Sequence, residues 1–148
     1  SSDVCSSDLG NISYTPANHT KMVHVRQAKV DGIANDIPPA VVQGDADADV
    51  CLLGWGSTWG AITSAMERTR ADGTKVAWIH LTHLNPLPLN LGNLLKGFRK
   101  VLVPELNLGQ LCRIVRANYL VDAQSVSKVE GLPFTGAEIE RAIQEALK

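Results

Sequence analysis

The glycine-rich stretch GWGSTWG, at residues 54–60, is the part of this sequence most typical of ligand-binding chemistry. Gly54, Gly56 and Gly60 follow the short apolar run VCLL and precede a segment with helical periodicity. Glycines at such a turn let the chain approach a pyrophosphate closely, and the free N–H groups of the following helix can hold the anion. The stretch is therefore a candidate for dinucleotide binding.

The acidic partner that an NAD site needs is missing, however. An aspartate or glutamate is expected about 20 residues after the glycines, where it holds the ribose hydroxyls. Residues 73–104 contain neither, and no arginine follows the second predicted strand to hold a 2′-phosphate. The sequence therefore disfavours NAD(P) binding and favours a simpler reason for the glycines, which is close packing of a helix on a strand.

Polar residues gather where the predicted strands end. Ligands of open α/β sheets bind outside the carboxyl ends of the strands, so we expect these residues to lie together. For each residue taken singly, a helix cap or a loop hydrogen bond is an equally good interpretation. The candidate docking surface consists of Gly54, Gly56, Ser57, Thr58, His83, Glu105, Asn107, Gly109 and Gln110.

Catalytic and metal-binding patterns find little support. His80 and His83 stand three residues apart at the end of a predicted strand, so their side chains should point to opposite faces. No neighbouring carboxylate completes a zinc site. There is no G-x-S-x-G motif around Ser57, and no thiamine diphosphate motif with a GDG and a later NN. We expect neither a catalytic residue nor a metal ligand in this chain.

Composition excludes several classes of partner. The 148 residues include 14 lysines and arginines against 15 aspartates and glutamates, without a basic stripe that would indicate nucleic acid. No apolar run approaches the roughly 18 residues that a membrane span requires. Cys51 and Cys112 lie inside apolar runs, which predicts buried thiols rather than a disulfide or a metal pair. The sequence therefore predicts a soluble, cytoplasmic domain.

The first nine residues, SSDVCSSDL, differ from the rest of the chain. One back-translation of Ser1–Leu9 matches the end of a common short-read sequencing adapter. We therefore expect residues 1–9 to be adapter-derived and disordered, and the natural protein to begin at or just after Gly10, within a longer gene. The alternative is a natural, flexible serine- and aspartate-rich tail.

Periodicity predicts a helix that precedes an α/β domain. Residues 10–48 comprise that helix, with Val23, Val30, Ile33 and Ala34 on its apolar stripe, and a connector rich in proline and aspartate. In residues 49–148, apolar runs alternate with amphipathic segments, which implies a sheet buried on both faces. We predict a three-layer αβα fold with a mostly parallel sheet. Its strands are expected at 50–53, 75–81 and 100–106, with an edge strand at 125–131, and its helices at 61–73, 91–98, 108–120 and 135–148.

Four blocks in order carry a family resemblance: LLGWGSTWGAI, WIHLTHLNPLP, KVLVPELNLGQLCRIVRANYLVD and KVEGLPFTGAEI. They resemble the C-terminal region of the alpha subunit of 2-oxoacid:ferredoxin oxidoreductases, particularly the 2-oxoglutarate enzyme. The upstream NHTKMVHVRQAKVDGIANDIPP resembles the helix that precedes this domain in the family. The likeness covers Gly10 to Lys148, and PELNLGQL and HLNPLP are its most specific parts.

The resemblance implies a multisubunit enzyme that oxidatively decarboxylates a 2-oxoacid, forms acyl-coenzyme A and reduces ferredoxin. It implies thiamine diphosphate, Mg and a 4Fe–4S cluster in the whole complex, carried chiefly by the beta subunit, and none bound by this chain. The matching region resembles the transketolase C-terminal domain and mainly organises subunit contacts. The family's earlier alpha-subunit domain is absent here, so we expect this chain alone to be inactive.

The same resemblance places the loops 54–60, 83–88 and 105–110 against the beta subunit or the preceding alpha domain. An exposed apolar patch is expected where those partners are missing. Two alternatives stay open. One is the matching domain of a transketolase-like protein or a 2-oxoacid dehydrogenase beta chain, which would reduce NAD through a lipoyl carrier instead of ferredoxin. The other is a stand-alone nucleotide-binding α/β module, which NAD, ATP or coenzyme A would stabilise thermally.

Overall fold

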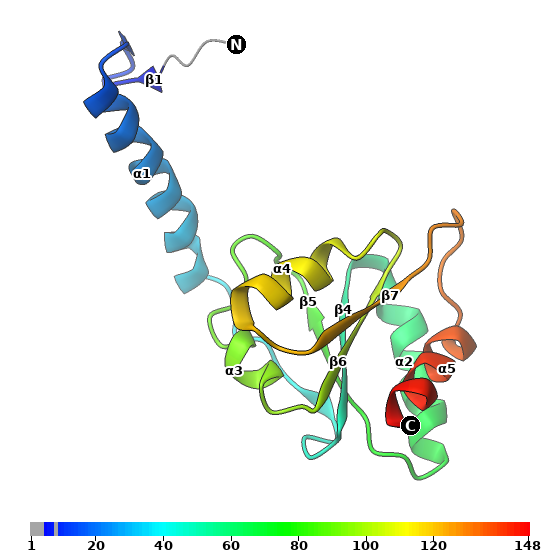
Figure 1. Ribbon diagram of the computed structural model, residues 1–148. Coiled ribbons are helices and arrows are strands. Elements are labelled where there is room, and N and C mark those ends of the chain that lie inside the picture. The colour runs from blue at the N-terminus through cyan, green and yellow to red at the C-terminus, as the bar shows by residue number, and fades with distance from the viewer. Residues whose placement is uncertain (1–4, 8) are drawn as a thin grey trace.

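A five-stranded sheet forms the centre of the molecule (Figure 1). The computed structural model describes residues 5–7 and 9–148. The strands stand in the order β3-β5-β4-β6-β7, and only β3 runs antiparallel to its neighbour. The sheet is therefore mostly parallel, as predicted. Its strands are β3 (Gln43–Gly44), β4 (Val50–Trp55), β5 (Ala77–Leu81), β6 (Lys100–Glu105) and β7 (Ala123–Ser127).

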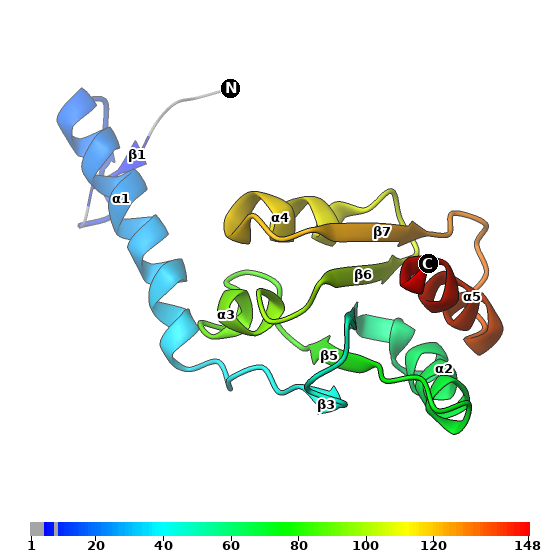
Figure 2. The ribbon, with the colours of Figure 1, turned by 60° about the horizontal axis from the view of Figure 1, so that its bottom comes forward.

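Helices cover both faces of this sheet (Figures 1 and 2). One layer consists of α2 (Trp59–Ala71) and α5 (Gly136–Leu147), and the other of α3 (Leu91–Leu95) and α4 (Gln110–Tyr119). The prediction of a three-layer αβα fold is confirmed.

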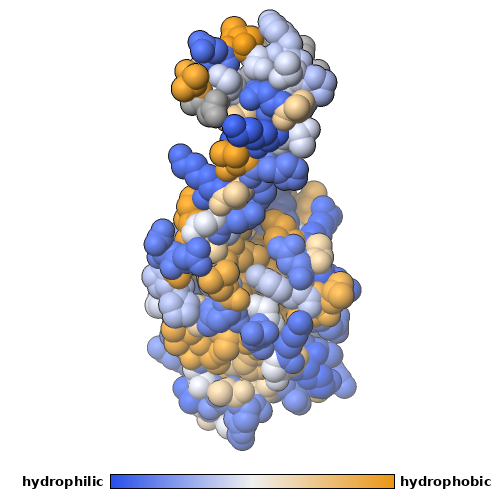
Figure 3. All heavy atoms as spheres, turned by 90° about the vertical axis from the view of Figure 1, so that its left-hand side faces the viewer, coloured by the Kyte–Doolittle hydropathy of each residue, from blue (hydrophilic) through white to orange (hydrophobic). Residues whose placement is uncertain are grey.

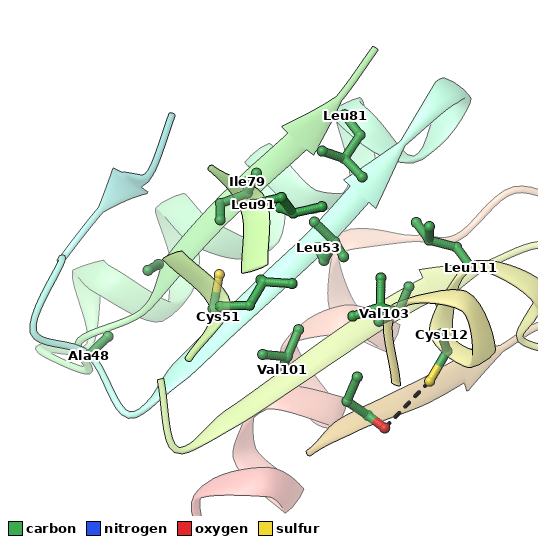
Figure 4. Close-up of a cluster of buried hydrophobic side chains, with 14 residues drawn as sticks. Ala48, Cys51, Leu53, Ile79, Leu81, Leu91, Val101, Val103, Leu111 and Cys112 are labelled. Carbon is green, nitrogen blue, oxygen red and sulfur yellow. Dashed lines mark hydrogen bonds between the residues drawn. The ribbon is translucent and has the colours of Figure 1, made fainter. Parts of the chain in front are cut away.

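The central strands β4, β5 and β6 are largely apolar because each of their faces meets a helix layer. In β4, Val50 and Leu52 belong to the cluster under α2 and α5, whereas Cys51 and Leu53 belong to the cluster under α3 and α4. All four are fully buried. Figure 4 shows the second cluster, in which alternate residues of β4, β5 and β6 meet the two short helices. The sheet thus separates two cores.

Helix α1 (Pro16–Gly32) begins after Thr15 and projects from the α/β domain (Figure 1). A short 3₁₀ helix, η1 (Ile33–Asn35), continues it. The helix lies where the sequence predicts, but none of its own residues is buried. Of its predicted apolar stripe only Ala34, in η1, is buried, and Val23 and Ile33 remain about half exposed. Among the described residues, this stripe lacks a covering surface.

The expected disorder of residues 1–9 is wrong for Cys5–Ser6. These residues form β1, which pairs antiparallel with β2 (Ile12–Ser13). The turn between them is closed by backbone bonds, one of which runs from the Gly10 N–H to the Ser7 carbonyl at 2.9 Å. Gly10 has φ +81, which glycine tolerates. Ser7 and Leu9 lie between β1 and β2, and residues 1–4 and 8 are outside the described residues. The adapter origin stays a prediction.

The edge strand β7 begins two residues earlier than predicted, at Ala123, and ends four residues earlier, at Ser127. The Lys128 N–H still donates to the Glu105 carbonyl of β6 at 3.0 Å, whereas the Lys128 side chain, only 10% exposed, binds the start of α5. Its Nζ donates to both Glu138 carboxylate oxygens at 2.8 and 3.0 Å and to the Pro133 carbonyl at 3.0 Å. Residues 128–135 therefore form an anchored loop that leads into α5.

The predicted helix at 135–148 begins with a capping box formed by Thr135 and Glu138. The Thr135 hydroxyl oxygen accepts the Glu138 N–H at 3.3 Å, and a Glu138 carboxylate oxygen accepts the Thr135 N–H at 2.7 Å. Lys128 and these bonds lower the pKa of Glu138 from 4.5 to about 2.

Within the described part of the chain, the structure contains no helix of the length and apolarity needed to cross a membrane.

The depressed pKa of Glu138 predicts an acid-dependent contribution to stability. The ionised carboxylate is favoured by folding, so its contribution is complete above the unfolded pKa near 4.5 and is lost as the pH falls toward about 2. Glu138→Gln keeps a capping side chain but removes the charge. Urea unfolding at several pH values should show a wild-type advantage over this variant at pH 6 that shrinks below pH 4.5. Glu145→Gln, on an exposed position of the same helix, is the control. An advantage independent of pH would contradict the assignment.

Candidate functional site

Gly54 is required by packing rather than by a nucleotide. It lies in β4, directly under α2, and a Cβ atom at this position would collide with Cδ1 of Ile62. The same Cβ would lie 3.2 Å from the Thr58 hydroxyl oxygen and 3.3 Å from Nδ1 of His80. This geometry matches the simpler interpretation of the glycine-rich turn, in which the glycine brings helix and strand together.

The remainder of the turn is closed by its own hydrogen bonds. Gly56 has φ +57, a conformation that favours glycine. The hydroxyl of Thr58 donates to the Trp55 carbonyl at 2.8 Å and accepts the Trp55 N–H at 3.2 Å. Thr58 is buried by these contacts, whereas Ser57 is exposed. Of the two hydroxyls, only that of Ser57 faces outward.

Glu105, at the end of β6, is fully buried. One carboxylate oxygen accepts the backbone N–H of Leu111 at 2.8 Å and the other accepts that of Cys112 at 3.1 Å. The side-chain amide of Asn107 also donates to Glu105, at 3.2 Å. A carboxylate here satisfies N–H groups that have no partner within the helix and opposes the positive end of the helix dipole.

Asn107 completes the cap of α4. Its side-chain oxygen accepts the N–H of Gly109 at 2.8 Å and the N–H of Gln110 at 3.0 Å. Gly109 has φ +79, and a Cβ there would stand 2.7 Å from the Ser125 hydroxyl oxygen of β7. The PELNLGQL block therefore connects β6, α4 and β7 through one hydrogen-bonded turn.

These contacts divide the predicted docking surface into buried and exposed residues. Thr58, Glu105, Gly54 and Gly109 are buried and position the loops within this chain. Gly56, Ser57, His83 and Gln110 are exposed and Asn107 is partly exposed.

The two histidines at the end of β5 differ in environment. His80 is partly buried against Trp59, with ring centroids 4.9 Å apart, and burial lowers the pKa of His80. His83 is exposed, and its Nδ1 lies 2.9 Å from the Thr82 hydroxyl oxygen. In the described residues, no three histidine, cysteine or acidic side chains are grouped as metal ligands.

Cys51 and Cys112 are buried thiols on different elements, β4 and α4. Burial raises the pKa of Cys51 to about 12 and also raises the pKa of Cys112. The Cys112 thiol donates to the Ala123 carbonyl at 3.4 Å (Figure 4). An iron–sulfur cluster needs several converging thiolates. These two protonated, separated thiols do not fit one.

A small pocket opens between the loops that follow β4 and β6. It has a volume of about 150 Å³. Because these neighbouring strands continue into helices on opposite faces, the pocket lies at the topological switch point of the sheet. Small-molecule sites usually occupy roughly 300–1,000 Å³, so this pocket suits a single side chain better than a nucleotide. It is lined by Trp55, Gly56, Ser57, Thr58, Leu106 and Asn107.

Exposed apolar side chains follow β6 and β7 at the same edge of the sheet. Leu106 is 40% exposed, Leu108 70%, Val129 63% and Leu132 61%, and we call these four residues the apolar edge. Leu108 was predicted as the first residue of a helix at 108–120, but α4 begins only at Gln110, so the predicted start of that helix is wrong. Periodicity did not find this edge, although an apolar patch somewhere on the domain was expected.

Comparison with known sequences identifies related proteins. The profile described as pyruvate:ferredoxin oxidoreductase core domain II matches residues 48–143. The chain is 52% identical over 139 residues to the 2-oxoglutarate oxidoreductase subunit KorA of Mycobacterium tuberculosis, covering 93% of this chain and 21% of that protein. It is 31% identical over 147 residues to the 2-oxoacid:ferredoxin oxidoreductase 2 subunit alpha of Aeropyrum pernix, covering 95% and 23%. The chain thus spans less than a quarter of these two relatives.

Solved structures that resemble this chain include an oxidoreductase of the same kind and a transketolase. The 2-oxoglutarate:ferredoxin oxidoreductase of Magnetococcus marinus, solved with 2-oxoglutarate, coenzyme A and succinyl-CoA bound, matches with a TM-score of 0.87 and 32% identity. The match covers 97% of this chain and 26% of that one. A split-gene transketolase matches 75% of this chain and 42% of its own with a TM-score of 0.59, and at 19% identity this supports the fold alone.

Removing the buried carboxylate of Glu105 should destabilise the domain strongly. Glu105→Ala leaves the N–H groups of Leu111 and Cys112 without acceptors in the interior, which should lower the free energy of unfolding by about 3 kcal/mol. The matched control is Gln110→Ala, because that exposed side chain lies at the same helix end; its effect should stay within about 0.5 kcal/mol. Urea denaturation measures both. Equal effects would contradict the capping role.

The packing role of Gly54 predicts a coupled pair of substitutions. Gly54→Ala should lower the free energy of unfolding by about 1–3 kcal/mol because its methyl group overlaps Cδ1 of Ile62. Ile62→Val removes that atom and should alone cost about 1 kcal/mol. In the double variant the loss should be smaller than the sum of the two single losses. Strict additivity in denaturant unfolding would show that Ile62 is not the obstructing group.

Proposed function

Since this chain belongs to the pyruvate:ferredoxin oxidoreductase core domain II family, we propose that it is the C-terminal part of the alpha subunit of a 2-oxoglutarate:ferredoxin oxidoreductase. The complete enzyme would decarboxylate 2-oxoglutarate oxidatively, form the acyl-coenzyme A and reduce ferredoxin. The observation that carries this proposal is the 52% identity to a 2-oxoglutarate oxidoreductase subunit over 93% of the chain. The likeness in shape to a structure with 2-oxoglutarate and succinyl-CoA bound supports it further.

Within that enzyme, this region would support assembly and supply no catalytic residue. The support is chemical. Glu105, a strong candidate for proton transfer by residue type, is fully buried and accepts hydrogen bonds from backbone N–H groups. Asn107 and Thr58 use their side chains within their own turns. These three side chains are therefore engaged in holding the loops.

The cofactors of the complex would lie on other parts of it. Thiamine diphosphate with Mg would supply the electron sink for decarboxylation, and a 4Fe–4S cluster would carry electrons to ferredoxin. The buried thiols of Cys51 and Cys112 do not fit a cluster, and we assign none of the described residues to thiamine. Coenzyme A and ferredoxin would likewise be partners of the whole complex, in the cytoplasm.

The partner of this region would be the beta subunit, docked on the apolar edge. Leu108 and Leu132 follow neighbouring strands and are largely exposed, as expected of side chains that a partner covers. Between the loops of β4 and β6, the pocket of about 150 Å³ could receive one side chain of that partner.

The two alternatives are separated by electron acceptor and ligand. The first alternative, a transketolase-like or dehydrogenase protein, is supported by the fold that this chain shares with the split-gene transketolase at 19% identity. Reduction of NAD through a lipoyl carrier, without ferredoxin reduction, would favour it. A nucleotide-binding module would require thermal stabilisation by NAD, ATP or coenzyme A, which the packing role of Gly54 does not lead us to expect.

Replacing the apolar edge should separate the subunits. In the complete alpha subunit, Leu108→Ser with Leu132→Ser should weaken association with the beta subunit by about tenfold or more, because two exposed apolar contacts are lost. Ile114→Ser, 44% exposed in the middle of α4, is the matched control. Co-purification and ferredoxin reduction with 2-oxoglutarate and coenzyme A are the measurements. Unchanged association would refute the interface, and a wild-type complex inactive in that assay would refute the enzyme assignment.

A further inference from the structure

Leu120 combines two unfavourable features at the end of α4. Its backbone has φ 54 and ψ 39, the left-handed conformation that glycine or asparagine usually provides at a helix end. Its side chain is also 90% exposed, the largest exposed fraction among the exposed apolar residues of the described chain. A strained, exposed leucine points to a contact that the isolated chain does not contain.

The backbone around Leu120 is held firmly. The N–H of Leu120 donates to the Arg116 carbonyl at 3.0 Å. The Arg116 guanidinium donates to the Ala123 carbonyl at 2.7 Å and pairs with the Asp122 carboxylate at 3.2 Å. A hollow of about 310 Å³ lies beside Leu120, lined by Arg116, Val121 and Asp122. The exposed side chain is thus presented from a fixed corner with room beside it.

A second unpartnered surface lies on the same side of the molecule. The C-terminal end of α4 and the projecting α1 lie on that side in both ribbon views (Figures 1 and 2). In α1 and η1, Val23 and Ile33 are 47% and 46% exposed, and Leu89, just before α3, is 71% exposed. Figure 3 shows apolar residues gathered on the face of the α/β domain below α1. A helix without any buried residue needs tertiary packing to be stable in water.

We propose that Leu120, Leu89 and the apolar stripe of α1 form a second docking surface, which the rest of the same polypeptide covers in the complete alpha subunit. This inference rests on the proposed function. The match to the Magnetococcus marinus chain covers 97% of this chain, so it includes α1, and it leaves most of that longer chain outside the match. The matched part of that protein therefore includes a counterpart of α1, and that protein has additional polypeptide available to cover it.

The partner that covers this second docking surface differs from the partner that covers the apolar edge. The apolar edge follows the carboxyl ends of β6 and β7, whereas Leu120 stands before the amino end of β7, so the two surfaces lie at opposite ends of that strand. One surface serves the beta subunit and the other serves the polypeptide to which α1 connects.

Leu120→Asn tests the proposal because its local effect on the helix end and its effect on docking should change the melting temperature in opposite directions. Asparagine adopts the left-handed conformation more readily than leucine, so a purely local effect would leave the melting temperature unchanged or raise it. Loss of a docking anchor should lower the melting temperature of the complete alpha subunit. It should also raise amide hydrogen exchange in α1 by tenfold or more, because the helix is released from its covering surface. Leu89→Asn, a second variant on the same surface, should act in the same direction.

Val129→Asn is the matched control, since Val129 is 63% exposed on the apolar edge. It should leave exchange in α1 unchanged and weaken only the association with the beta subunit. An unchanged or raised melting temperature for Leu120→Asn, with unchanged exchange in α1, would overturn the proposal. So would loss of beta-subunit association without faster exchange, or a wild-type dimer of alpha subunits that Leu120→Asn dissociates. An inactive wild-type complex would instead overturn the proposed function. Hydrogen exchange in α1 would then still test the second docking surface.

Discussion

Four backbone N–H groups at the start of α4 are satisfied by two side chains, and much of the molecule depends on this arrangement. Glu105 accepts two of them and Asn107 the other two, and Asn107 also donates to Glu105. Without these acceptors, the buried end of α4 would carry unpaired donors in the interior. The same turn brings Gly109 against Ser125 of β7 and determines where Leu106 and Leu108 emerge. The position of α4, the packing of β7 at the sheet edge and the exposure of the apolar edge therefore all depend on this one turn.

The layers of the fold could be predicted because their signal is local and repeated. A strand between two helix layers buries both faces, so the run from Val50 to Leu53 has no polar alternation. The capping box of Thr135 and Glu138 is likewise encoded by a spacing of three residues. Glu105 was predicted on the docking surface, but it is buried. Its acceptors bind N–H groups six and seven residues away, and no short sequence motif predicts a turn that brings them together.

Exposure was harder to predict than periodicity. The stripe on α1 was identified correctly as apolar, yet in the structure Val23 and Ile33 remain half exposed. Periodicity states which side chains share a face of a helix, but it does not state whether another surface covers that face. Leu120 shows the same limit: nothing in its neighbours indicates that the helix ends there in a left-handed conformation. Such residues require the three-dimensional arrangement to be recognised.

The separation of the interior into two cores has a consequence for how this family changes over time. Leu52 and Leu53 are adjacent in the chain, but their side chains belong to different clusters on opposite sides of β4. A change of volume on one side can be accommodated by repacking among helices α2 and α5 without a compensating change beneath α3 and α4. Each layer can then diverge at its own pace while the sheet between them stays in place. This independence is consistent with a shape retained at a TM-score of 0.87 although only 32% of the residues are shared.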